Sequence, residues 1–363
     1  MTFDRVAIIG TGLMGTSVAM AAARVGSSVS GWDPDLAALA TAEARSGLSA
    51  SKDLIDACSD ADLVILAGPV GTLADSAVEA LHASGSAVVT DLGSVKLSIV
   101  DQVSAGTPPE AAARFVGSHP MGGSERSGPS HASEAVLDGI VWVLTPSEGT
   151  GRDVLERMQV WITGLGARPV VMTPSRHDRL VALVSHLPQV ASTTLMSLAA
   201  TEESDEPDIL LLAAGGFRDL TRLAASNPEI WSSILLANSD ALVEAIDQYL
   251  ERLRTMRDLI GSRREDELRK AFGLAKEARL AMSAKPQVRS GISVILVPVP
   301  DRPGSLAQLT SALGEGGVNI EDLQIVHSAE GGRGTVHLSV ASSEAERADR
   351  VLAGSGFDPT RLA

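Results

Sequence analysis

The sequence predicts an α/β domain with a mainly parallel sheet, then an all-helical block, then a small α+β domain. Three observations lead to this order. Short apolar runs alternate with helical stretches as far as Pro174, helical periodicity continues alone from Arg176 to about Ala284, and strands and helices alternate again after residue 290. We therefore predict domains at residues 1–174, 175–285 and 290–363, with a linker at 283–291. A chain of 363 residues is long enough for three such domains.

The first domain is predicted from short apolar runs that read as buried strands. They cover residues 6–10, 29–33, 63–69, 87–93, 114–120, 141–146 and 168–174. Runs of this length, separated by helical stretches, are typical of strands that lie between two layers of helices. The expected architecture is therefore a mainly parallel sheet covered on both faces.

The other two domains have different patterns. The helical block holds a long, largely apolar helix at 177–200 and two amphipathic helices at 242–260 and 264–282, whose outer faces are charged. The tail reads as a strand at 292–300, a helix at 304–317, strands at 320–328 and 333–342, and a helix at 343–356. This is a βαββα order, and the last seven residues are short for a closing strand.

Composition excludes several function classes. With a formal charge of −15, the sequence lacks the basic excess that is typical of nucleic-acid binding. An anionic substrate would therefore need a few positively charged side chains at its binding site. No apolar run approaches the ~20 residues that a membrane helix needs, and the first residues do not resemble a signal peptide. A single cysteine, Cys58, is compatible with a reducing compartment. We expect a cytoplasmic protein that binds neither nucleic acid nor membrane.

The stretch GTGLMG predicts a dinucleotide site of the Rossmann type. It contributes Gly10, Thr11, Gly12, Leu13, Met14 and Gly15, between the first strand and the first helix. Glycines at these three places allow a tight turn, close approach of a pyrophosphate to the backbone, and close packing of helix on strand. The helix N-terminus then offers N–H groups to the phosphates. A merely structural glycine turn is the alternative.

Asp33 and a second loop complete the predicted cofactor site. Asp33 lies 18 residues beyond the third glycine, at the end of the second strand, where a carboxylate can accept hydrogen bonds from a ribose 2′-hydroxyl. No arginine or lysine follows it in WDPDLAALA, so NAD is favoured over NADP. Gly68, Pro69 and Val70 follow the third predicted strand, at the sheet edge where a cofactor would pass.

Polar side chains that could carry chemistry follow two other strands and recur in the helical block. Ser94 follows one strand, and His119 ends another, with Glu125 close behind. Ligands in such sheets bind outside the carboxyl ends of the strands. His119 is therefore a candidate base, and Ser94 could hydrogen-bond the same substrate hydroxyl as His119. From the helices, His186 and Arg222 could complete the site, since Arg222 can hold a carboxylate as a bidentate fork.

Structural alternatives stand beside these roles. Ser94 could cap a helix that begins at Val95, and Lys96 could be a solvated residue of its first turn. His186 could be a core histidine, and His177 and His82 read as surface residues. One of the two arginines, Arg218 or Arg222, could have no role beyond an ion pair with a nearby acidic residue. The sequence contains no C-x-x-C, H-E-x-x-H or paired acidic cluster, so we expect no metal site.

Five motifs together resemble the TyrA family, the prephenate and arogenate dehydrogenases of tyrosine biosynthesis. They are GTGLMG, TDLGSVK, GSHPMGGSERSG, SHLPQ and GGFRDLTRLAASNPEIW, in the order and spacing of that family over about residues 5–285. The resemblance implies that His119 is the catalytic histidine, which takes the hydroxyl proton of prephenate. It also implies that Ser94 hydrogen-bonds the substrate hydroxyl and His119. It also implies an NAD-dependent oxidative decarboxylation that yields 4-hydroxyphenylpyruvate.

The resemblance assigns the remaining site residues as well. Glu125 matches the acid of the active-site entrance, His186 the histidine of the long helix, and Arg222 the arginine that grips a carboxylate. Trp231 matches the tryptophan that reaches a neighbouring site in family dimers, so a homodimer is expected. Many prephenate-specific members read SHLPH where this chain has Gln189, which leaves arogenate open as the substrate.

The tail resembles an ACT domain, a module that binds small regulatory molecules. In such a fold the turn VPDRPGSL and the segment GVNI lie together at one end of the sheet. N–H groups from Gly304 onward could receive the carboxylate of an aromatic amino acid, which we expect to be tyrosine. Asp301 and Asn319 could meet its ammonium group. Alternatively, Pro303 and Gly304 only shape the turn, and the module only dimerises.

Two other functions remain open from the sequence. A β-hydroxyacid dehydrogenase would suit the glycine-rich turn, but that class uses a lysine from the long interdomain helix, and residues 177–200 contain none. A non-catalytic sensor of NAD and amino acids is a rival of another class. The presence of His119, Ser94 and Arg222 argues against such a sensor.

Overall fold

The structure is a computed structural model that describes residues 3–122, 127–202, 208–283, 292–300, 302–327 and 333–361. The chain divides into two compact units. The first comprises Met1–Ser197 and Leu223–Tyr249, and the second comprises Leu198–Arg222 and Leu250–Ala363. Most of the predicted linker at 283–291, together with Glu125 and Asp301, lies outside the described residues.

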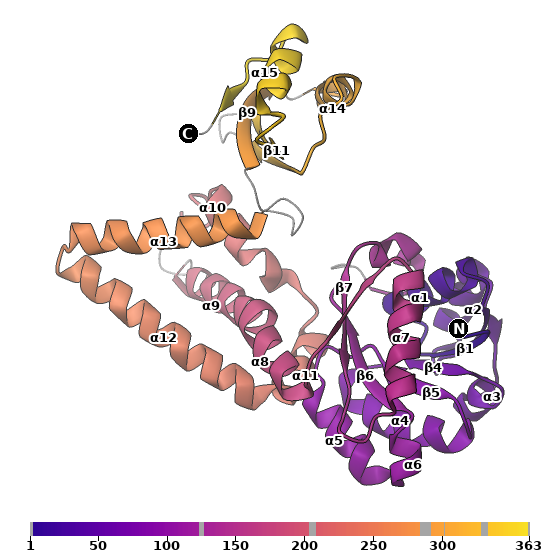
Figure 1. Ribbon diagram of the computed structural model, residues 1–363. Coiled ribbons are helices and arrows are strands. Elements are labelled where there is room, and N and C mark those ends of the chain that lie inside the picture. The colour runs from indigo at the N-terminus through magenta and orange to yellow at the C-terminus, as the bar shows by residue number, and fades with distance from the viewer. Residues whose placement is uncertain are drawn as a thin grey trace. The chain divides into compact units, whose positions relative to one another are not determined.

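The first unit contains an eight-stranded sheet in the order β3-β2-β1-β4-β5-β6-β7-β8 (Figure 1). The strands are β1 (Arg5–Ile9), β2 (Ser28–Trp32), β3 (Ser49–Ala50), β4 (Leu63–Leu66), β5 (Val88–Asp91), β6 (Phe115–Pro120), β7 (Val141–Thr145) and β8 (Arg168–Val171). All neighbours pair in parallel except β6 and β7, which are antiparallel. The Rossmann-type fold is confirmed. The short edge strand β3 was not predicted, because two residues carry no readable alternation.

Helices cover both faces of this sheet. They are α1 (Leu13–Arg24), α2 (Leu36–Ser46), α3 (Leu54–Cys58), α4 (Val70–Ala83), α5 (Leu97–Gly106), α6 (Pro109–Ala112) and α7 (Arg152–Gly164), with short turns η1 (Pro129–His131) and η2 (Glu134–Leu137). Because side chains alternate along a strand, Val6 and Ile8 face one helical layer while Ala7 and Ile9 face the other.

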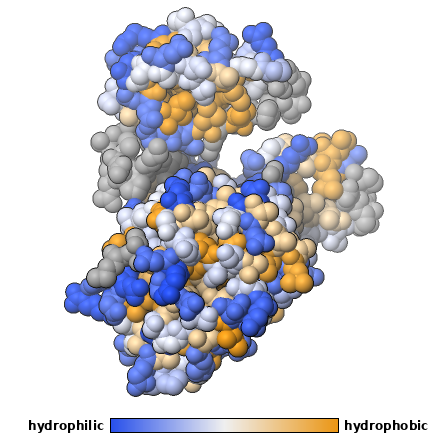
Figure 2. Space-filling view, turned by 90° about the vertical axis from the view of Figure 1, so that its right-hand side faces the viewer, coloured by the Kyte–Doolittle hydropathy of each residue, from blue (hydrophilic) through white to orange (hydrophobic). Residues whose placement is uncertain are grey.

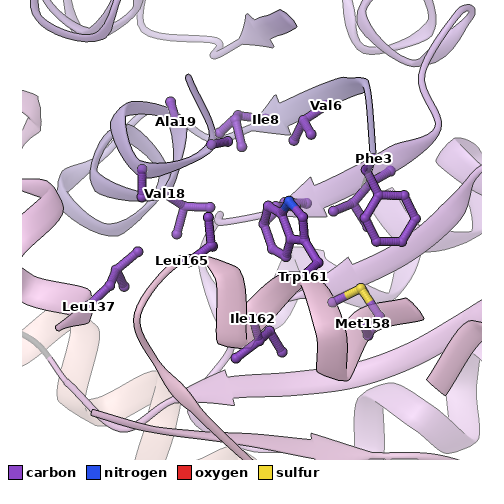
Figure 3. Packing of buried hydrophobic residues seen from close by; sticks show 14 of the residues in the cluster. Phe3, Val6, Ile8, Val18, Ala19, Leu137, Met158, Trp161, Ile162 and Leu165 are labelled. Carbon is purple, nitrogen blue, oxygen red and sulfur yellow. The ribbon is translucent and has the colours of Figure 1, made fainter. Parts of the chain in front are cut away.

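The first layer packs α1 and α7 against the sheet. Figure 3 shows Trp161 and Met158 of α7 beside Phe3, with Val18 of α1 close to Leu165. The rings of Phe3 and Trp161 meet edge to face at 6.1 Å, an arrangement that aromatic pairs prefer. The opposite layer contains α3, α4 and α5, and its core includes Leu66 and Leu73. Both faces of the sheet are therefore buried. A ligand can reach the sheet at the ends of its strands.

From Pro174 to Ser283 the described secondary-structure elements are all helical. They are α8 (Pro174–Val181), the π-helical turn η3 (Ala182–His186), α9 (Leu187–Glu202), α10 (Gly215–Thr221), the 3-10 turn η4 (Arg222–Ala225), α11 (Pro228–Ala237), α12 (Ser239–Gly261) and α13 (Glu265–Ser283). The predicted helical block is confirmed, but what reads as one long helix over 177–200 contains a π-helical turn. No helix among the described residues is long and apolar enough to cross a membrane.

The C-terminal part of the second unit has a sheet of its own, in the order β10-β11-β9-β12. Its elements are β9 (Ile292–Pro300), α14 (Ser305–Glu315), β10 (Asp322–His327), β11 (Arg333–Ala341), α15 (Ala345–Gly354) and β12 (Thr360–Arg361). All its pairs are antiparallel. The order is thus βαββαβ, since the last residues do form a short closing strand. Ile295, Leu309 and Leu338 belong to its separate core.

Candidate functional site

The glycine-rich turn lies between β1 and α1, and its geometry requires glycine at two places. Gly10 has φ +98°, a left-handed conformation, and a Cβ there would lie 2.7 Å from the carbonyl carbon of Ala67. A Cβ on Gly15 would lie 2.0 Å from the carbonyl oxygen of Gly10. The two loops that follow β1 and β4 are therefore in close contact. This contact brings the predicted cofactor residues Gly68, Pro69 and Val70 to the same edge of the sheet as the turn.

The start of α1 is open to a ligand. Gly12 is the N-cap of α1, no side chain caps the helix, and a Cβ on Gly12 would meet nothing within 4 Å. A helix start of this kind offers N–H groups and a positive dipole end to an anion. Leu13 and Met14 begin the helix. The turn fits a dinucleotide pyrophosphate in shape and in charge.

Asp33 sits beside this turn, at the end of β2. Its Oδ2 accepts hydrogen bonds from the Thr11 backbone N–H at 2.6 Å and from Thr11 Oγ1 at 3.3 Å. Its Oδ1 accepts from the Asp35 N–H at 2.9 Å. The carboxylate is therefore fixed next to the glycines, where it can accept from a ribose hydroxyl and would repel a 2′-phosphate.

His119 lies on β6, half-buried, near the carboxyl end of the neighbouring strand β5. Ser94 lies in the turn between β5 and α5 and is also half-buried. Because β5 and β6 are parallel neighbours, both residues are at the same edge of the sheet. Ser94 does not cap a helix at Val95, so this alternative was wrong. Helix α5 begins at Leu97, and its first amides are capped from another segment.

That cap is Asp178, which also begins a chain of side chains that ends at His119. The Asp178 carboxylate accepts from the N–H groups of Lys96 and Leu97, each at 2.8 Å. Asp178 Oδ1 lies 2.7 Å from His177 Nδ1, and His177 Nε2 lies 2.9 Å from His119 Nδ1. Both Asp178 and His177 are buried, so reading His177 as a surface residue was wrong. The structure thus joins an aspartate and two histidines in a row.

This row determines which nitrogen of His119 is free. An ionised Asp178 only accepts hydrogen bonds, so His177 Nδ1 carries a proton and a neutral His177 accepts at Nε2. His119 then donates from Nδ1 and keeps its lone pair on Nε2. Burial holds the pKa of His119 well below its usual value, and His177, Lys96 and His186 act in the same direction. His119 is therefore a neutral base near neutral pH.

A buried ion pair supports the strand beneath His119. Lys96 Nζ is hydrogen-bonded to Asp91 Oδ2 and donates to the Ser118 carbonyl at 2.8 Å, and neither side chain is exposed to solvent. Asp91 also accepts from the N–H groups of Gly93 at 2.9 Å and Ser118 at 3.3 Å. Reading Lys96 as solvated was therefore wrong. Burial lowers the pKa of Lys96, and the Asp91 carboxylate opposes that shift.

Ser118 has two further hydrogen bonds beside this pair. Its Oγ donates to the Asp91 carbonyl at 2.7 Å and accepts from Trp142 Nε1 at 2.9 Å. These bonds lie beyond the last ladder positions of β5 and β6, which are Thr90 and Val116. Side chains therefore hold the two strands together where the backbone ladder ends, immediately before His119.

The helical segment brings His186 and Trp231 to the same unit. His186 is buried at the end of the π-helical turn, and the ring of Trp231 meets it edge to face at 6.2 Å. His186 contributes to the lowered pKa of His119, which places the two imidazoles in one electrostatic neighbourhood. His186 is a core histidine by burial. Burial does not exclude a role at the site, because His186 is among the residues that act on the pKa of His119.

Gln189 is used within the fold. Its Nε2 donates to the Leu223 carbonyl at 2.9 Å, and its Oε1 accepts from Ser226 Oγ at 3.4 Å. These bonds tie α9 to the segment around η4, the turn that begins at Arg222. The structure thus gives Gln189 a local structural task, while Arg222 belongs to the second unit. Glu125 lies outside the described residues.

Two of the predicted effector residues, Pro303 and Gly304, lie at the start of α14. A cavity of about 450 Å³ is lined by Arg302, Pro303, Gly304, Leu306 and Ala307. Gly304 is the N-cap of α14, with φ +89°, and no side chain caps the helix. Asn319 is exposed, and its Nδ2 donates to Glu321 Oε1 at 2.6 Å. Asp301 lies outside the described residues.

The positioning roles of His177, Asp178, Asp91 and Lys96 are not predicted by the sequence pattern. One signal was available, because an adjacent His–Asp pair opens the helical block in the stretch SRHDRL. An acid directly after an apolar strand, at Asp91, was another. Neither signal says which distant side chain the residue meets.

Two family descriptions match successive parts of this chain. Residues 18–175 match the family described as "Prephenate dehydrogenase, nucleotide-binding domain", and residues 173–274 match "Prephenate dehydrogenase, dimerization domain". The C-terminal sheet lies beyond both matches. A cyclohexadienyl dehydrogenase from Zymomonas mobilis is 32% identical over 294 residues, which cover 79% of this chain and 99% of that protein.

Two solved structures are similar over most of their length. One is prephenate dehydrogenase from A. aeolicus in complex with hydroxyphenyl propionate and NAD+, with 29% identity, a TM-score of 0.73, and coverage of 78% of this chain and 99% of that one. The other is Synechocystis arogenate dehydrogenase, with 28% identity, a TM-score of 0.67, and coverage of 77% and 99%.

Proposed function

We propose that this chain, which belongs to the prephenate dehydrogenase family, oxidises and decarboxylates prephenate to 4-hydroxyphenylpyruvate with NAD. The observation that carries the proposal is the row Asp178–His177–His119, which ends in a neutral base at the carboxyl edge of a nucleotide-binding sheet. The glycine turn and Asp33 would hold the cofactor. When bound, NAD supplies the hydride acceptor.

The chain's own residues handle the proton. Prephenate is a cyclohexadienol with a ring hydroxyl and a ring carboxylate. His119 Nε2 accepts the hydroxyl proton as the carbon that bears it loses a hydride. Loss of CO2 then makes the ring aromatic, and the proton returns to the phenolate oxygen. His177 and Asp178 hold the imidazole in place through the row of hydrogen bonds, so that Nε2 keeps its lone pair for the substrate hydroxyl. Ser94 hydrogen-bonds the same hydroxyl from the neighbouring strand end.

Arogenate is the second candidate substrate. Gln189 replaces the histidine of many prephenate-specific members, and one similar structure is an arogenate dehydrogenase. The two substrates differ only in the side chain, which ends in a pyruvyl or an alanyl group. NADH formation measured with each substrate separately decides between them. Absence of NADH with both substrates would refute the proposed function.

Cofactor choice provides a first prediction. The enzyme should turn over much faster with NAD than with NADP. Asp33→Asn should reduce this difference between the two cofactors, because it removes the charge that repels a 2′-phosphate. Asparagine can still accept from Thr11, so the loop is preserved better than in Asp33→Ala. The matched control is Asp35→Asn, which removes the same charge but keeps the cap of α2. A wild-type enzyme that prefers NADP would contradict this role of Asp33.

Arg222 provides a second prediction. It grips a substrate carboxylate, so Arg222→Ala should raise KM for the substrate by the equivalent of about 2–5 kcal/mol. Arg222→Lys should not restore binding, since lysine lacks the planar fork. Arg218→Ala, one turn earlier on α10, is the control and should leave KM unchanged. Steady-state kinetics with saturating NAD measure KM for the substrate in each variant. An unchanged KM in Arg222→Ala would show that the arginine has only a structural role.

The proposed assembly is a cytoplasmic homodimer formed through the helical segment. Large apolar side chains are exposed there, including Leu183, Val184, Leu198, Leu211, Leu212, Leu220, Leu236, Phe272 and Leu274. Apolar side chains also reach the surface between polar ones on the face drawn in Figure 2. Burial of such side chains between two copies would stabilise a dimer, and Trp231 would lie near the partner's site. Sedimentation at micromolar concentration tests the dimer.

The C-terminal part is proposed as an ACT-like regulatory domain that binds tyrosine. Its βαββαβ order, the cavity beside Pro303 and Gly304, and the uncapped start of α14 support this role. Ser305 adds to them, because its Oγ is buried and has no hydrogen-bond partner among the described residues. An uncapped helix start can receive a carboxylate. Asp301 and Asn319 would then meet the ammonium group.

Truncation provides a third prediction. Removal of the chain from Gly291 onward should leave turnover intact but abolish inhibition by tyrosine, because the effector site is separate from the active site. Linkage also requires that tyrosine bind less tightly to the intact enzyme when substrate is saturating. Inhibition curves for both forms test this. Equal potency against the two forms would place tyrosine in the active site as a product analogue.

A further inference from the structure

Asn238 connects two parts of the helical segment through one side-chain nitrogen. The residue follows α11 and is buried, with 5% of its surface exposed. Its Nδ2 donates to the Asp178 carbonyl at 2.9 Å and lies 3.1 Å from His186 Nδ1. Asn238 therefore contacts the backbone of a residue in the His119 row and the second buried histidine at the same time.

The π-helical turn allows this double contact. Carbonyl groups point toward the C-terminus of a helix, whereas side chains lean toward its N-terminus. The Asp178 carbonyl in α8 and the His186 side chain at the end of η3 therefore point toward each other along the chain. Within this turn the Leu187 N–H donates to the Ala182 carbonyl, five residues earlier. The extra residue changes the direction of His186, and such turns are frequent at functional sites.

The contacts determine where the proton of His186 is. A backbone carbonyl only accepts hydrogen bonds, so the side-chain atom of Asn238 that faces Asp178 is the NH2 group. The same NH2 group faces His186 Nδ1, which must therefore present a lone pair. A neutral His186 then carries its proton on Nε2. Burial lowers the pKa of His186 to about 4, so the neutral form is the one present near neutral pH.

We propose that Asn238 is a positioning residue that fixes His186 as the Nε2–H tautomer and thereby makes it an uncharged hydrogen-bond donor to an oxygen atom of the substrate. This second step rests on the proposed function and on the substrate-site role that the family resemblance assigns to His186. A donor at this place recognises a carboxylate or keto oxygen and offers nothing to an ammonium group. Asn238 acts only through His186 and does not itself touch the reacting atoms.

The first test reads the tautomer and needs no substrate. NMR of the full chain with 15N-labelled histidine, with the signals assigned through His186→Gln, should show an unprotonated Nδ1 and a protonated Nε2 for His186. Asn238→Asp replaces the donor by an acceptor, so Nδ1 should gain a proton. The matched control is Asn227→Asp at the other end of α11, where aspartate is an equally good helix cap. An Nδ1–H tautomer in the wild type would overturn the proposal.

The second test uses surrogates and keeps Asn238 intact, in case Asn238→Asp does not fold. A glutamine amide can reach the position of Nε2, whereas an asparagine amide replaces Nδ1. His186→Gln should therefore keep KM for the substrate within a few-fold of the wild type, and His186→Asn should raise it by about tenfold, as expected for one lost hydrogen bond. Equal KM values for the two variants would overturn donation from Nε2. Failure of turnover in the wild type would refute the proposed function and leave the tautomer result standing.

Discussion

His119→Asn should lower kcat by about 10²–10⁴-fold while NAD binding stays near normal, because the variant loses Nε2, the atom proposed to accept the substrate's hydroxyl proton. Asparagine is of similar size and can still donate to His177 Nε2, so the row of side chains behind it is preserved. Stopped-flow or steady-state formation of NADH measures kcat, and titration of the protein's fluorescence with NAD measures binding. The control is His82→Asn, a change at an exposed position on α4.

The pH dependence follows from the lowered pKa of His119. A base is active when it is neutral, so activity is lost as the pH falls through its pKa in the folded enzyme. Burial, together with the neighbouring His177, Lys96 and His186, holds that pKa well below 6.5, so the acid limb of kcat/KM should also lie below 6.5. An acid limb at or above 6.5 would contradict this environment, and near-normal kcat in His119→Asn would remove His119 from the mechanism.

Lys96→Met should destabilise the protein by about 3–5 kcal/mol, because it leaves the Asp91 carboxylate buried without its counter-ion. For a unit of this size, each kcal/mol corresponds to about 2–4 °C in Tm, so a loss of at least about 6 °C is expected in thermal unfolding. The variant should also lower kcat, since Lys96 Nζ holds the carbonyl of Ser118, the residue before His119. Lys52→Met, at an exposed position, is the matched control.

A double variant separates the charge from the hydrogen bonds. Asp91→Asn combined with Lys96→Met removes both charges, and an asparagine oxygen can still accept from the N–H groups of Gly93 and Ser118. Because loss of both partners avoids an isolated buried charge, the double variant should recover most of the stability. If it were no more stable than Lys96→Met alone, the pair would not be the source of the effect.

The features of this protein that depend on local chemistry can be predicted from its sequence. The turn GTGLMG, with Asp33 after the next strand, requires only neighbouring residues to form a nucleotide site, because glycine conformation and strand–helix order are local properties. The alternation of strands and helices and the helical block were predicted for the same reason. His119 and Ser94 could be placed at one edge of the sheet from the strand ends alone.

Burial and side-chain contacts depend on the tertiary fold, because no local sequence pattern encodes them. Lys96 reads as a solvated lysine and is buried, because Asp91 and Ser118 supply its partners. His177 reads as exposed and lies against His119, although 58 residues separate them in the sequence. The pKa of His119 and its free nitrogen depend on these distant contacts. A side chain's charge, tautomer and access to solvent are set by whatever the fold packs against it, and that is decided only when the chain is folded.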